Sequence, residues 1–339
     1  ILVLFFGQYL NDELVFYLSY AVSLAGITQA IFLVIFVKKF YKPRFNFAFS
    51  KDVRVKLFFK KLLPSIFSSG VTQINILIGT IIASFQASAV SYLYYADRIY
   101  QINLAIAGIA IGIVILPNLS KYVKVKNFSK VNFIQNKSVE LSFFLSLPAA
   151  ICLLIGSKEI TSALFGYGSF DEQSVNNSAI ALFYFSIGLP AFSMIKIFSS
   201  FLFARDNTKI PFYFSLVSVI INISISLSLF NKVGFIIIPI ATSFSSWVNA
   251  IILFIYIYNK KYFSFRAGAF LLYLRMLLSS ILSSILFFSL IKFFNNYLVY
   301  ESDYKLLFII ILVLLTFVIY ILISMITKAF NKSDIKLKY

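Results

Sequence analysis

An aspartate and an arginine stand side by side in a long stretch of the sequence that otherwise carries no charge. Asp97 and Arg98 have no charged neighbour back to Lys61 or forward to Lys121. A charge near the centre of a bilayer costs about 2.5–3.5 kcal/mol on insertion scales, so such charges usually face a bundle interior or a wet cavity. The pair therefore predicts a functional site inside a membrane. The alternative is that both residues only link neighbouring helices.

The composition excludes several other kinds of site. The sequence has no histidine, which removes histidine-based triads, metal sites and proton relays. Its single cysteine, Cys152, lies in an apolar run, so we expect no intrachain disulfide and no cysteine metal cluster. No acidic metal cluster and no nucleophile–base pair is visible in the sequence. We therefore expect no enzyme, no metal centre and no bound cofactor.

The elements that position the pair must be membrane helices. The chain is 60% hydrophobic and 12% charged, and its 41 Phe and 21 Tyr fit lipid-facing surfaces and interfacial belts. Several charge-free windows can span about 30 Å of hydrocarbon at about 1.5 Å per residue. The net charge of +18 could indicate a nucleic-acid partner. The basic residues are grouped in short loops between apolar runs, however, which is the pattern of membrane topology. We expect an all-α polytopic membrane protein.

The apolar runs predict where these helices lie. The chain begins at Ile1 in the middle of an apolar run, so we expect a downstream portion of a longer protein, with residues 1–10 ending a spanning helix. We interpret the chain as eight full transmembrane helices plus this partial one. The predicted helices cover residues 14–37, 62–86, 90–119, 139–156, 174–204, 210–230, 234–258, 269–291 and 305–327. Every second connection is basic, which predicts a cytoplasmic C-terminus.

Two neighbouring predicted helices carry a polar face. In helix 62–86, helical spacing aligns Ser68, Thr72, Asn75 and Gly79, which either pack helices closely or line a cavity. In helix 90–119, one face is polar in its first half and small in its second. Its members are Ser91, Tyr94, Arg98, Gln101, Ala105, Gly108 and Gly112. This pattern predicts a cavity at one end of the helix and tight packing at the other.

Two further cations lie within predicted helices. Lys196 belongs to helix 174–204, where Pro190 predicts a kink. Lys196 either binds a ligand or extends its ammonium to the membrane surface, because it lies near a helix end. Arg275 lies close to the cytoplasmic end of its helix, which favours a role as an anchor.

The stretch SYLYYADRIYQ (91–101), followed by GIAIGIVILPNLSK (108–121), resembles the signature of the MurJ/MviN lipid II flippases. Other segments agree with that family in order and spacing, and the resemblance runs from about residue 8 to the end. They are KKLLPSIFSSGVTQINILIGTIIAS (60–84), LFGYGSF (164–170), Lys196 and FLFARDNTKIP (201–211). The two stretches with Tyr-Ala-Asp-Arg and Ala-Arg-Asp-Asn-Thr-Lys-Ile-Pro are specific when found together.

The resemblance implies a fold of the MOP/MATE-like superfamily with fourteen transmembrane helices. Such a fold has two six-helix lobes related by pseudo-symmetry and two C-terminal helices. The chain would then hold only part of that fold. The implied parts are a remnant of the first lobe (1–40), a basic cytoplasmic linker (41–61), the second lobe (62–258), a two-helix extension (259–327) and a cytoplasmic tail (328–339).

The resemblance also implies site residues. Arg98 is similar to a cavity arginine that contacts the lipid pyrophosphate, Asp97 to its neighbour and Ser91 to a position facing the same cavity. An arginine suits a diphosphate because its planar fork donates hydrogen bonds in pairs and stays charged. Lys196 would add positive potential. The helices around Arg275 are similar to those bordering a groove for the lipid tail.

The sequence departs from the family pattern in two places. Asn103 and Ala105 stand where Pro and Gly are usual, which predicts a weaker bend in that helix. Some family members hold sodium with a carboxylate in helix seven, which is residues 62–86 here and has none. A weak echo of that ion site remains in Asn222, Ser226 and Thr242. Sodium or the membrane potential would drive transport.

The implied function is the transfer of lipid II from the cytoplasmic to the outer face of the bacterial inner membrane. Membrane lipids and cell-wall synthesis enzymes are the other expected partners. The alternatives are a flippase of the same superfamily for O-antigen, teichoic-acid or capsule lipid intermediates, an ion-coupled exporter, or a scaffold that binds cell-wall enzymes. An ion-coupled exporter usually needs an intramembrane carboxylate, and only Asp97 and Glu140 are available.

Overall fold

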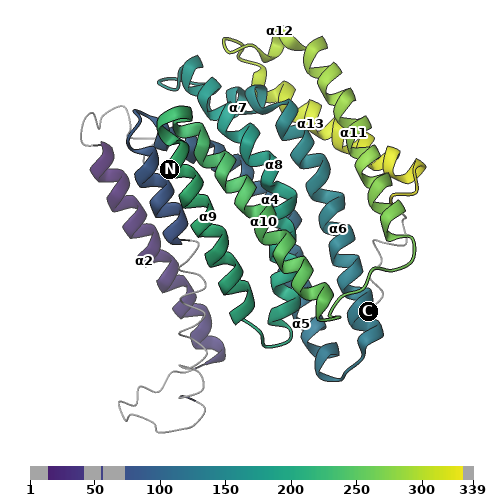
Figure 1. Ribbon diagram of the computed structural model, residues 1–339. Coiled ribbons are helices and arrows are strands. Elements are labelled where there is room, and N and C mark those ends of the chain that lie inside the picture. Colours follow the sequence, from purple (N-terminus) through teal and green to yellow (C-terminus); the bar gives the residue numbers. More distant parts are fainter. Residues whose placement is uncertain (1–13, 42–54, 56–72, 331–339) are drawn as a thin grey trace. The chain divides into compact units, whose positions relative to one another are not determined.

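The structure is a computed structural model of the chain that describes residues 14–41, 55 and 73–330. Every regular element in these ranges is a helix (Figure 1). The chain divides into two compact units, residues 1–58 and 59–339. The expectation of an all-helical membrane protein is confirmed. Seven described helical stretches are long and apolar enough to cross a membrane, and one of them, 209–259, contains two successive helices.

The first unit contains one described helix, α2 (Leu14–Phe40), which was predicted over residues 14–37. It is apolar around its whole circumference, which is typical of a membrane-spanning helix. Lys38 and Lys39 lie in its last turn, where the negative end of the helix dipole stabilises their positive charges.

The second unit begins in its described part with a helix over Gln73–Ala83, followed by a turn at residues 84–88. Residues 62–72 of the predicted helix 62–86 lie outside the described residues. The elements that follow are α4 (Ala89–Leu104), η3 (Ala105–Ala110), α5 (Ile111–Lys124), α6 (Phe128–Ile155), α7 (Ser157–Phe165), α8 (Glu172–Phe203), α9 (Lys209–Val233), η4 (Gly234–Ile236), α10 (Ile237–Asn259), α11 (Ala269–Phe293), α12 (Asn295–Leu298) and α13 (Lys305–Ile326).

Three details of the predicted helices need correction. The sequence predicts nine helical ranges, whereas we inferred eight full helices from them. Helix α6 begins at Phe128 instead of residue 139, so Lys130 and Lys137 lie in a helix and not in a loop. The Asn127 side chain caps this helix by accepting a hydrogen bond from the Lys130 amide at 3.1 Å. The connection after α6 also contains a helix, α7.

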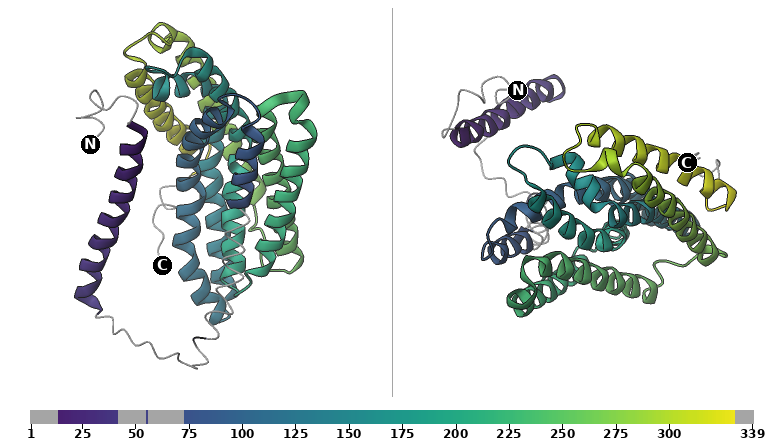
Figure 2. Two further views of the ribbon diagram at one scale, coloured as in Figure 1. Left: turned by 90° about the vertical axis from the view of Figure 1, so that its left-hand side faces the viewer. Right: turned by 90° about the horizontal axis from the view of Figure 1, so that it is seen from above.

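Helix α8 forms the centre of the second unit. It packs against α4, α6, α7 and α10. Figure 2 shows the pair α9 and α10 on one side of α4, α6 and α8, and the pair α11 and α13 on the other side. Small residues permit these close approaches. A Cβ added at Gly188 would lie 3.0 Å from Ser243 Cα on α10, and one added at Gly108 would lie 3.0 Å from Ser193 Cα on α8. Close approach through small residues is a usual basis of membrane helix packing.

A π-helical segment, η3, interrupts the helix that carries the aspartate–arginine pair. It begins at Ala105, one of the two positions where the sequence departs from the family pattern. The Asn103 side chain donates to the Ile99 carbonyl at 3.2 Å, and the Ser142 hydroxyl of α6 donates to the Ala107 carbonyl at 2.7 Å. Because a π segment adds a residue to a turn, α4 and α5 present different faces to the same side of the bundle.

Candidate functional site

The Asp97–Arg98 pair lies in the wall of a cavity of about 450 Å³. Helix α4 contributes the pair together with Tyr94 and Gln101, and the other walls come from helix 73–83, α8, α9 and α10. The pair was predicted to face a cavity, and the structure places both side chains there. Asp97 is half-buried and Arg98 is exposed.

Neighbouring α4 residues orient the pair. Gln101 Nε2 donates a hydrogen bond to Asp97 Oδ2, and Arg98 Nη1 donates to Gln101 Oε1 at 3.4 Å. The Arg98 guanidinium carbon lies 4.5 Å from the centre of the Tyr94 ring, a cation–π distance. No carboxylate of the described residues lies within 4.0 Å of the guanidinium. Most of its five N–H donors therefore remain available to an anion in the cavity.

The opposite wall of this cavity holds the three residues that echo an ion site. Asn222 Nδ2 donates to Thr242 Oγ1 at 3.1 Å, and Ser226 Oγ donates to Asn222 Oδ1 at 3.1 Å. These bonds join α9 to α10. The three side chains supply only neutral oxygens, two of which already accept hydrogen bonds. The set therefore fits a structural joint better than a resident cation, which favours carboxylate ligands.

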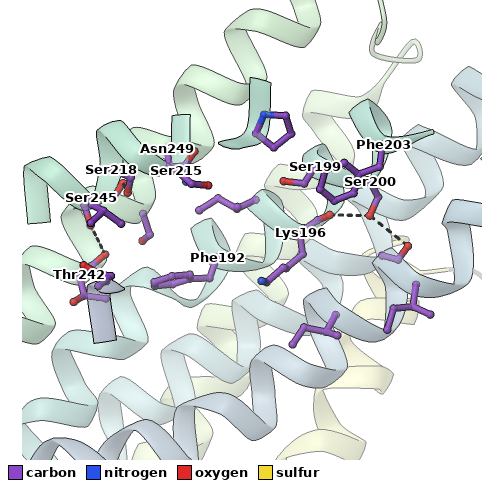
Figure 3. Close-up of a pocket in the computed structure, with 18 of the residues that line it drawn as sticks. Phe192, Lys196, Ser199, Ser200, Phe203, Ser215, Ser218, Thr242, Ser245 and Asn249 are labelled. Atoms are coloured by element: carbon purple, nitrogen blue, oxygen red, sulfur yellow. Dashed lines mark hydrogen bonds between the residues drawn. The ribbon is translucent and has the colours of Figure 1, made fainter. Parts of the chain in front are cut away.

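Lys196 lies in a second cavity of about 410 Å³ bounded by α5, α8, α9 and α10. Figure 3 shows the side chain extending into this space with its ammonium on the side of Phe192. Ser200 and Ser218 donate to backbone carbonyls, of Lys196 at 2.9 Å and of Ser245 at 2.8 Å. Hydroxyl groups thus line the cavity that the exposed Lys196 side chain enters.

The Lys196 cavity also contains an unsatisfied buried acceptor. Asn249 is 5% exposed, and among the described residues its Oδ1 atom has no hydrogen-bond partner. Unpaired buried polar atoms are rare because they lose their hydration without compensation. The cavity is therefore suited to water or to a polar ligand.

The two cavities adjoin, because Asn75 and Thr242 line both. Gly79 lines the cavity of Arg98 as well. This favours the cavity alternative for the polar face of helix 62–86, although Ser68 and Thr72 lie outside the described residues. The structure thus brings Arg98 and Lys196 to two neighbouring cavities.

Not every predicted site residue lies on a cavity wall. Ser91 is exposed on α4 but does not line the cavity of Arg98. Conversely, the role of Gln101 as the bridge between Asp97 and Arg98 was not predicted. The four-residue spacing from Asp97 to Gln101 was the available signal, since residues at that spacing meet on a helix surface.

The stretch 201–211, one of the segments that resemble the family, has a structural explanation in Arg205. Its Nη1 donates to the Phe201 carbonyl at 2.8 Å and its Nη2 to the Tyr262 carbonyl at 3.0 Å. The guanidinium carbon lies 4.6 Å from the centre of the Tyr262 ring. Arg205 therefore ties the end of α8 to the connection after α10.

A third hollow, of about 500 Å³, is apolar and lies among α4, α6, α7, α11 and α13. The helix that carries Arg98 contributes Ile99 and Ile106 to this groove, and α13 contributes Ile310, Val313 and Phe317. One face of α4 therefore lines a polar cavity while another face lines an apolar groove.

This fold and its cavities define a polytopic membrane protein whose helices enclose several cavities. A solved structure titled "Lipid II flippase MurJ, inward closed conformation" superposes with a TM-score of 0.64 at 23% identity, over 82% of this chain and 56% of that one. An outward-facing MATE family multidrug resistance transporter of the MOP superfamily superposes with a TM-score of 0.50 at 15% identity, over 69% of this chain and 53% of that one. At these identities the likeness concerns the fold alone.

The chain belongs to the lipid II flippase MurJ family, whose model matches residues 1–313. A "Probable lipid II flippase MurJ" of Rickettsia prowazekii is 35% identical over 308 residues, which are 91% of this chain and 60% of that protein. The protein of the same name from Rhizobium meliloti is 39% identical over 243 residues, which are 70% and 44% of the two chains. The chain thus spans about half the length of these relatives.

Proposed function

We propose that this chain forms the second lobe and the C-terminal helix pair of a flippase that carries lipid II across the bacterial inner membrane. Family membership supports the cargo, because the relatives are named as lipid II flippases. The family is one of transporters, so we propose that no bond of the cargo is made or broken.

The chemistry of the cargo sets what the protein must provide. Lipid II carries a diphosphate, a saccharide–peptide head and a polyprenyl tail. Moving the head through hydrocarbon would strip water from its charges and hydrogen-bonding groups, at a prohibitive cost in free energy. A carrier therefore needs a polar, cationic cavity for the head beside an apolar groove for the tail. The two faces of α4 border one space of each kind.

Arg98 is the proposed diphosphate contact. This role is supported by the position of the guanidinium in the cavity, where Tyr94 and Gln101 orient it. Most of its N–H donors have no hydrogen-bond partner among the described residues. Asp97 acts through Gln101 to hold this orientation. Lys196, in the adjoining cavity, raises the positive potential that the diphosphate meets.

The apolar groove is the proposed path of the tail. Its walls combine the helix of Arg98 with α11 and α13, so a lipid whose head lies near Arg98 can keep its tail in an apolar surface. Rocking of the two lobes of the complete protein would then expose the cavity on alternate membrane faces, as in transporters built from repeats. Sodium or the membrane potential would drive the cycle, and the cytoplasmic C-terminus follows from the basic loops.

The decisive experiment compares Arg98→Ala with Lys260→Ala in a full-length flippase. Lys260, at the end of α10, lines neither cavity and serves as a control for the loss of one cation. Loss of charge-assisted hydrogen bonds, worth about 1.5–3 kcal/mol, should lower lipid II translocation in liposomes at least about tenfold for Arg98→Ala. Cells that depend on the variant should also fail to grow.

Three outcomes would redirect the proposal. Normal growth and transport with Arg98→Ala would remove Arg98 from the mechanism. Transport of another polyprenyl-diphosphate saccharide in preference to lipid II would keep the mechanism and change the cargo. A protein that binds cell-wall enzymes but moves neither lipid would be a scaffold.

A further inference from the structure

A separate groove of about 380 Å³ runs along the antiparallel helices α5 and α6. It shares no lining residue with the cavities of Arg98 and Lys196 or with the groove beside α13. Its walls are mostly apolar. Asn118, Tyr122 and Lys130 lie toward the turn that joins the two helices, and Lys137 and Ser138 lie farther along α6. The lining residues are Ala110, Ile111, Val114, Ile115, Asn118, Tyr122, Lys130, Phe133, Ile134, Lys137, Ser138 and Leu141.

The apolar part of this groove is open. The side chains of Val114 and Phe133 are 57% and 55% exposed although they belong to membrane-spanning helices. They line the groove from its two helices, and Leu141 continues the apolar surface along α6. Such a surface is suited to an extended hydrocarbon chain, because burying apolar area is favourable and most of the lining there is apolar.

The basic end of the groove is built around Tyr122. Lys130 Nζ lies 4.9 Å and Lys121 Nζ 5.9 Å from the centre of the Tyr122 ring. Among the described residues, no carboxylate lies within 4.0 Å of either ammonium. Two like charges gathered at one ring favour an anion between them, because each lowers the free energy of the anion and the anion screens their repulsion.

The charge of the surrounding segment points the same way. From Ile99 to Val139 the sequence has five lysines and no acidic residue. The first carboxylate beyond it, Glu140, is shared between Lys137 at 3.2 Å and Arg266 at 3.0 Å. Basic loops mark the cytoplasmic side, so this end of the groove lies where anionic phospholipid headgroups are found.

We propose that the groove between α5 and α6 binds an anionic glycerophospholipid of the membrane. Its phosphate lies against Lys130, Lys121 and the Tyr122 ring, and one acyl chain lies between Val114 and Phe133. A bound lipid bridges the two helices just beyond the π segment η3. It stabilises the arrangement of α5 against α6, separately from the cargo site.

The test uses the full chain in detergent with dioleoylphosphatidylglycerol as the probe. Lys130→Gln removes the lysine that lines the groove, and Lys124→Gln removes one charge from the same basic segment away from it. Binding is followed by native mass spectrometry and by the rise in melting temperature. Loss of one lysine near a headgroup should weaken binding about fivefold for Lys130→Gln, with little change for Lys124→Gln.

Further arms separate the sources of affinity. Val114→Trp fills the apolar part and should also weaken binding, while dioleoylphosphatidylcholine and inorganic phosphate alone should bind much less than phosphatidylglycerol. Equal losses in the two lysine variants, or equal binding of the zwitterionic lipid, would overturn the proposal. So would protection by polyprenyl phosphate at Lys130 without protection by phosphatidylglycerol, because the occupant would then be the carrier lipid.

Discussion

Two parts of the second unit carry charged residues in its membrane helices, and they hold those charges in opposite ways. In the wall of the first cavity, Arg98 is exposed and makes one long hydrogen bond, of 3.4 Å, to Gln101. Where α6 and α13 meet connections between other helices, Glu140 and Lys305 are only 5% and 2% exposed, and each has two close partners. Burial and the closeness of the polar contacts, rather than the number of partners, separate a charge that is free to meet a ligand from one that holds the fold.

Around Glu140, side chains of α6 bind the connection between α10 and α11. Asn132, Asn136 and Glu140 follow at four-residue spacing and so share a face of α6. The Ser264 amide donates to Asn132 Oδ1 at 3.2 Å, and Asn136 Nδ2 donates to the Ser264 carbonyl at 2.9 Å. Arg266 donates its amide to Asn136 Oδ1 at 3.1 Å and pairs through Nε with Glu140 at 3.0 Å.

The second buried charge, Lys305, binds α13 to the connection between α7 and α8. Its ammonium donates to the Gly166 and Tyr300 carbonyls, both at 2.6 Å, and lies 4.2 Å from the Tyr167 ring centre. The Tyr300 hydroxyl donates to the Phe170 carbonyl at 3.0 Å. These contacts join α13 to the connection before α8, and those of Glu140 join α6 to the connection before α11.

The largest effect on stability should follow from Lys305→Ala. The change leaves two buried carbonyls without their charged donor, at about 1.5–3 kcal/mol for each lost bond, so the free energy of unfolding should fall by about 3 kcal/mol or more. Thermal unfolding in detergent measures this. Lys292→Ala, which removes an exposed lysine from α11, is the matched control and should change stability by less than about 0.5 kcal/mol. Equal melting temperatures for the two variants would contradict the assignment.

A smaller loss is expected for Glu140→Gln. The amide keeps the size of the carboxylate but removes the negative charge that Lys137 and Arg266 both contact. Removing one partner of a buried pair costs about 3–5 kcal/mol, and the half-exposed Arg266 side chain lowers this to about 1–2 kcal/mol. Glu172→Gln, which breaks an exposed pair with Lys158, should cost less than about 0.5 kcal/mol. A comparable loss of stability in both variants would show that burial of Glu140 does not increase the contribution of its ion pairs.

The positions of the helices were predictable because hydrocarbon length and charge placement constrain them strongly. Helices α8, α9, α10, α11 and α13 begin and end within three residues of the predicted ranges. The start of α6 was missed because its first turns, from Phe128 to Glu140, are polar and extend beyond the apolar run. An apolar-run criterion detects the part of a helix in hydrocarbon and not the part that continues outside it.

The candidate site was predictable only where a charge stood alone. Arg98 and Asp97 drew attention because they interrupt a long uncharged stretch. Lys305 gave no comparable signal, since its partner Gly166 lies 139 residues away and offers only a backbone carbonyl. Sequence spacing can reveal partners on one helix, as for Asp97 and Gln101, but not those brought together by tertiary packing.

The variant Arg98→Ala should separate an effect on transport from an effect on stability. Arg98→Ala removes one 3.4 Å bond to Gln101 and one cation–π contact with Tyr94, both at an exposed side chain. Its free energy of unfolding should therefore change by less than about 0.5 kcal/mol while lipid II transport falls. Measuring both on the same preparation decides the point. A melting temperature as low as that of Lys305→Ala would place Arg98 among the structural charges.

The smallest effect concerns a charge at the rim of the bundle, Asp171, which caps the start of α8. The Ser174 side chain and the Ser174 amide, the latter at 2.8 Å from Asp171 Oδ1, donate hydrogen bonds that hold the pKa of this carboxyl below its usual value. Because the folded pKa is the lower one, the stabilisation is complete above the unfolded pKa of about 3.9 and is lost as the pH falls through the folded value.

Asp171→Asn keeps an N-cap of similar quality but cannot titrate. The variant should therefore match the native chain at a pH below the folded pKa of Asp171 and be slightly less stable at about pH 7, where only the carboxylate is also stabilised by the positive end of the helix dipole. Melting temperatures at the two pH values test this. An equal difference at both pH values would show that the cap acts through shape alone and that the charge of Asp171 does not contribute to stability.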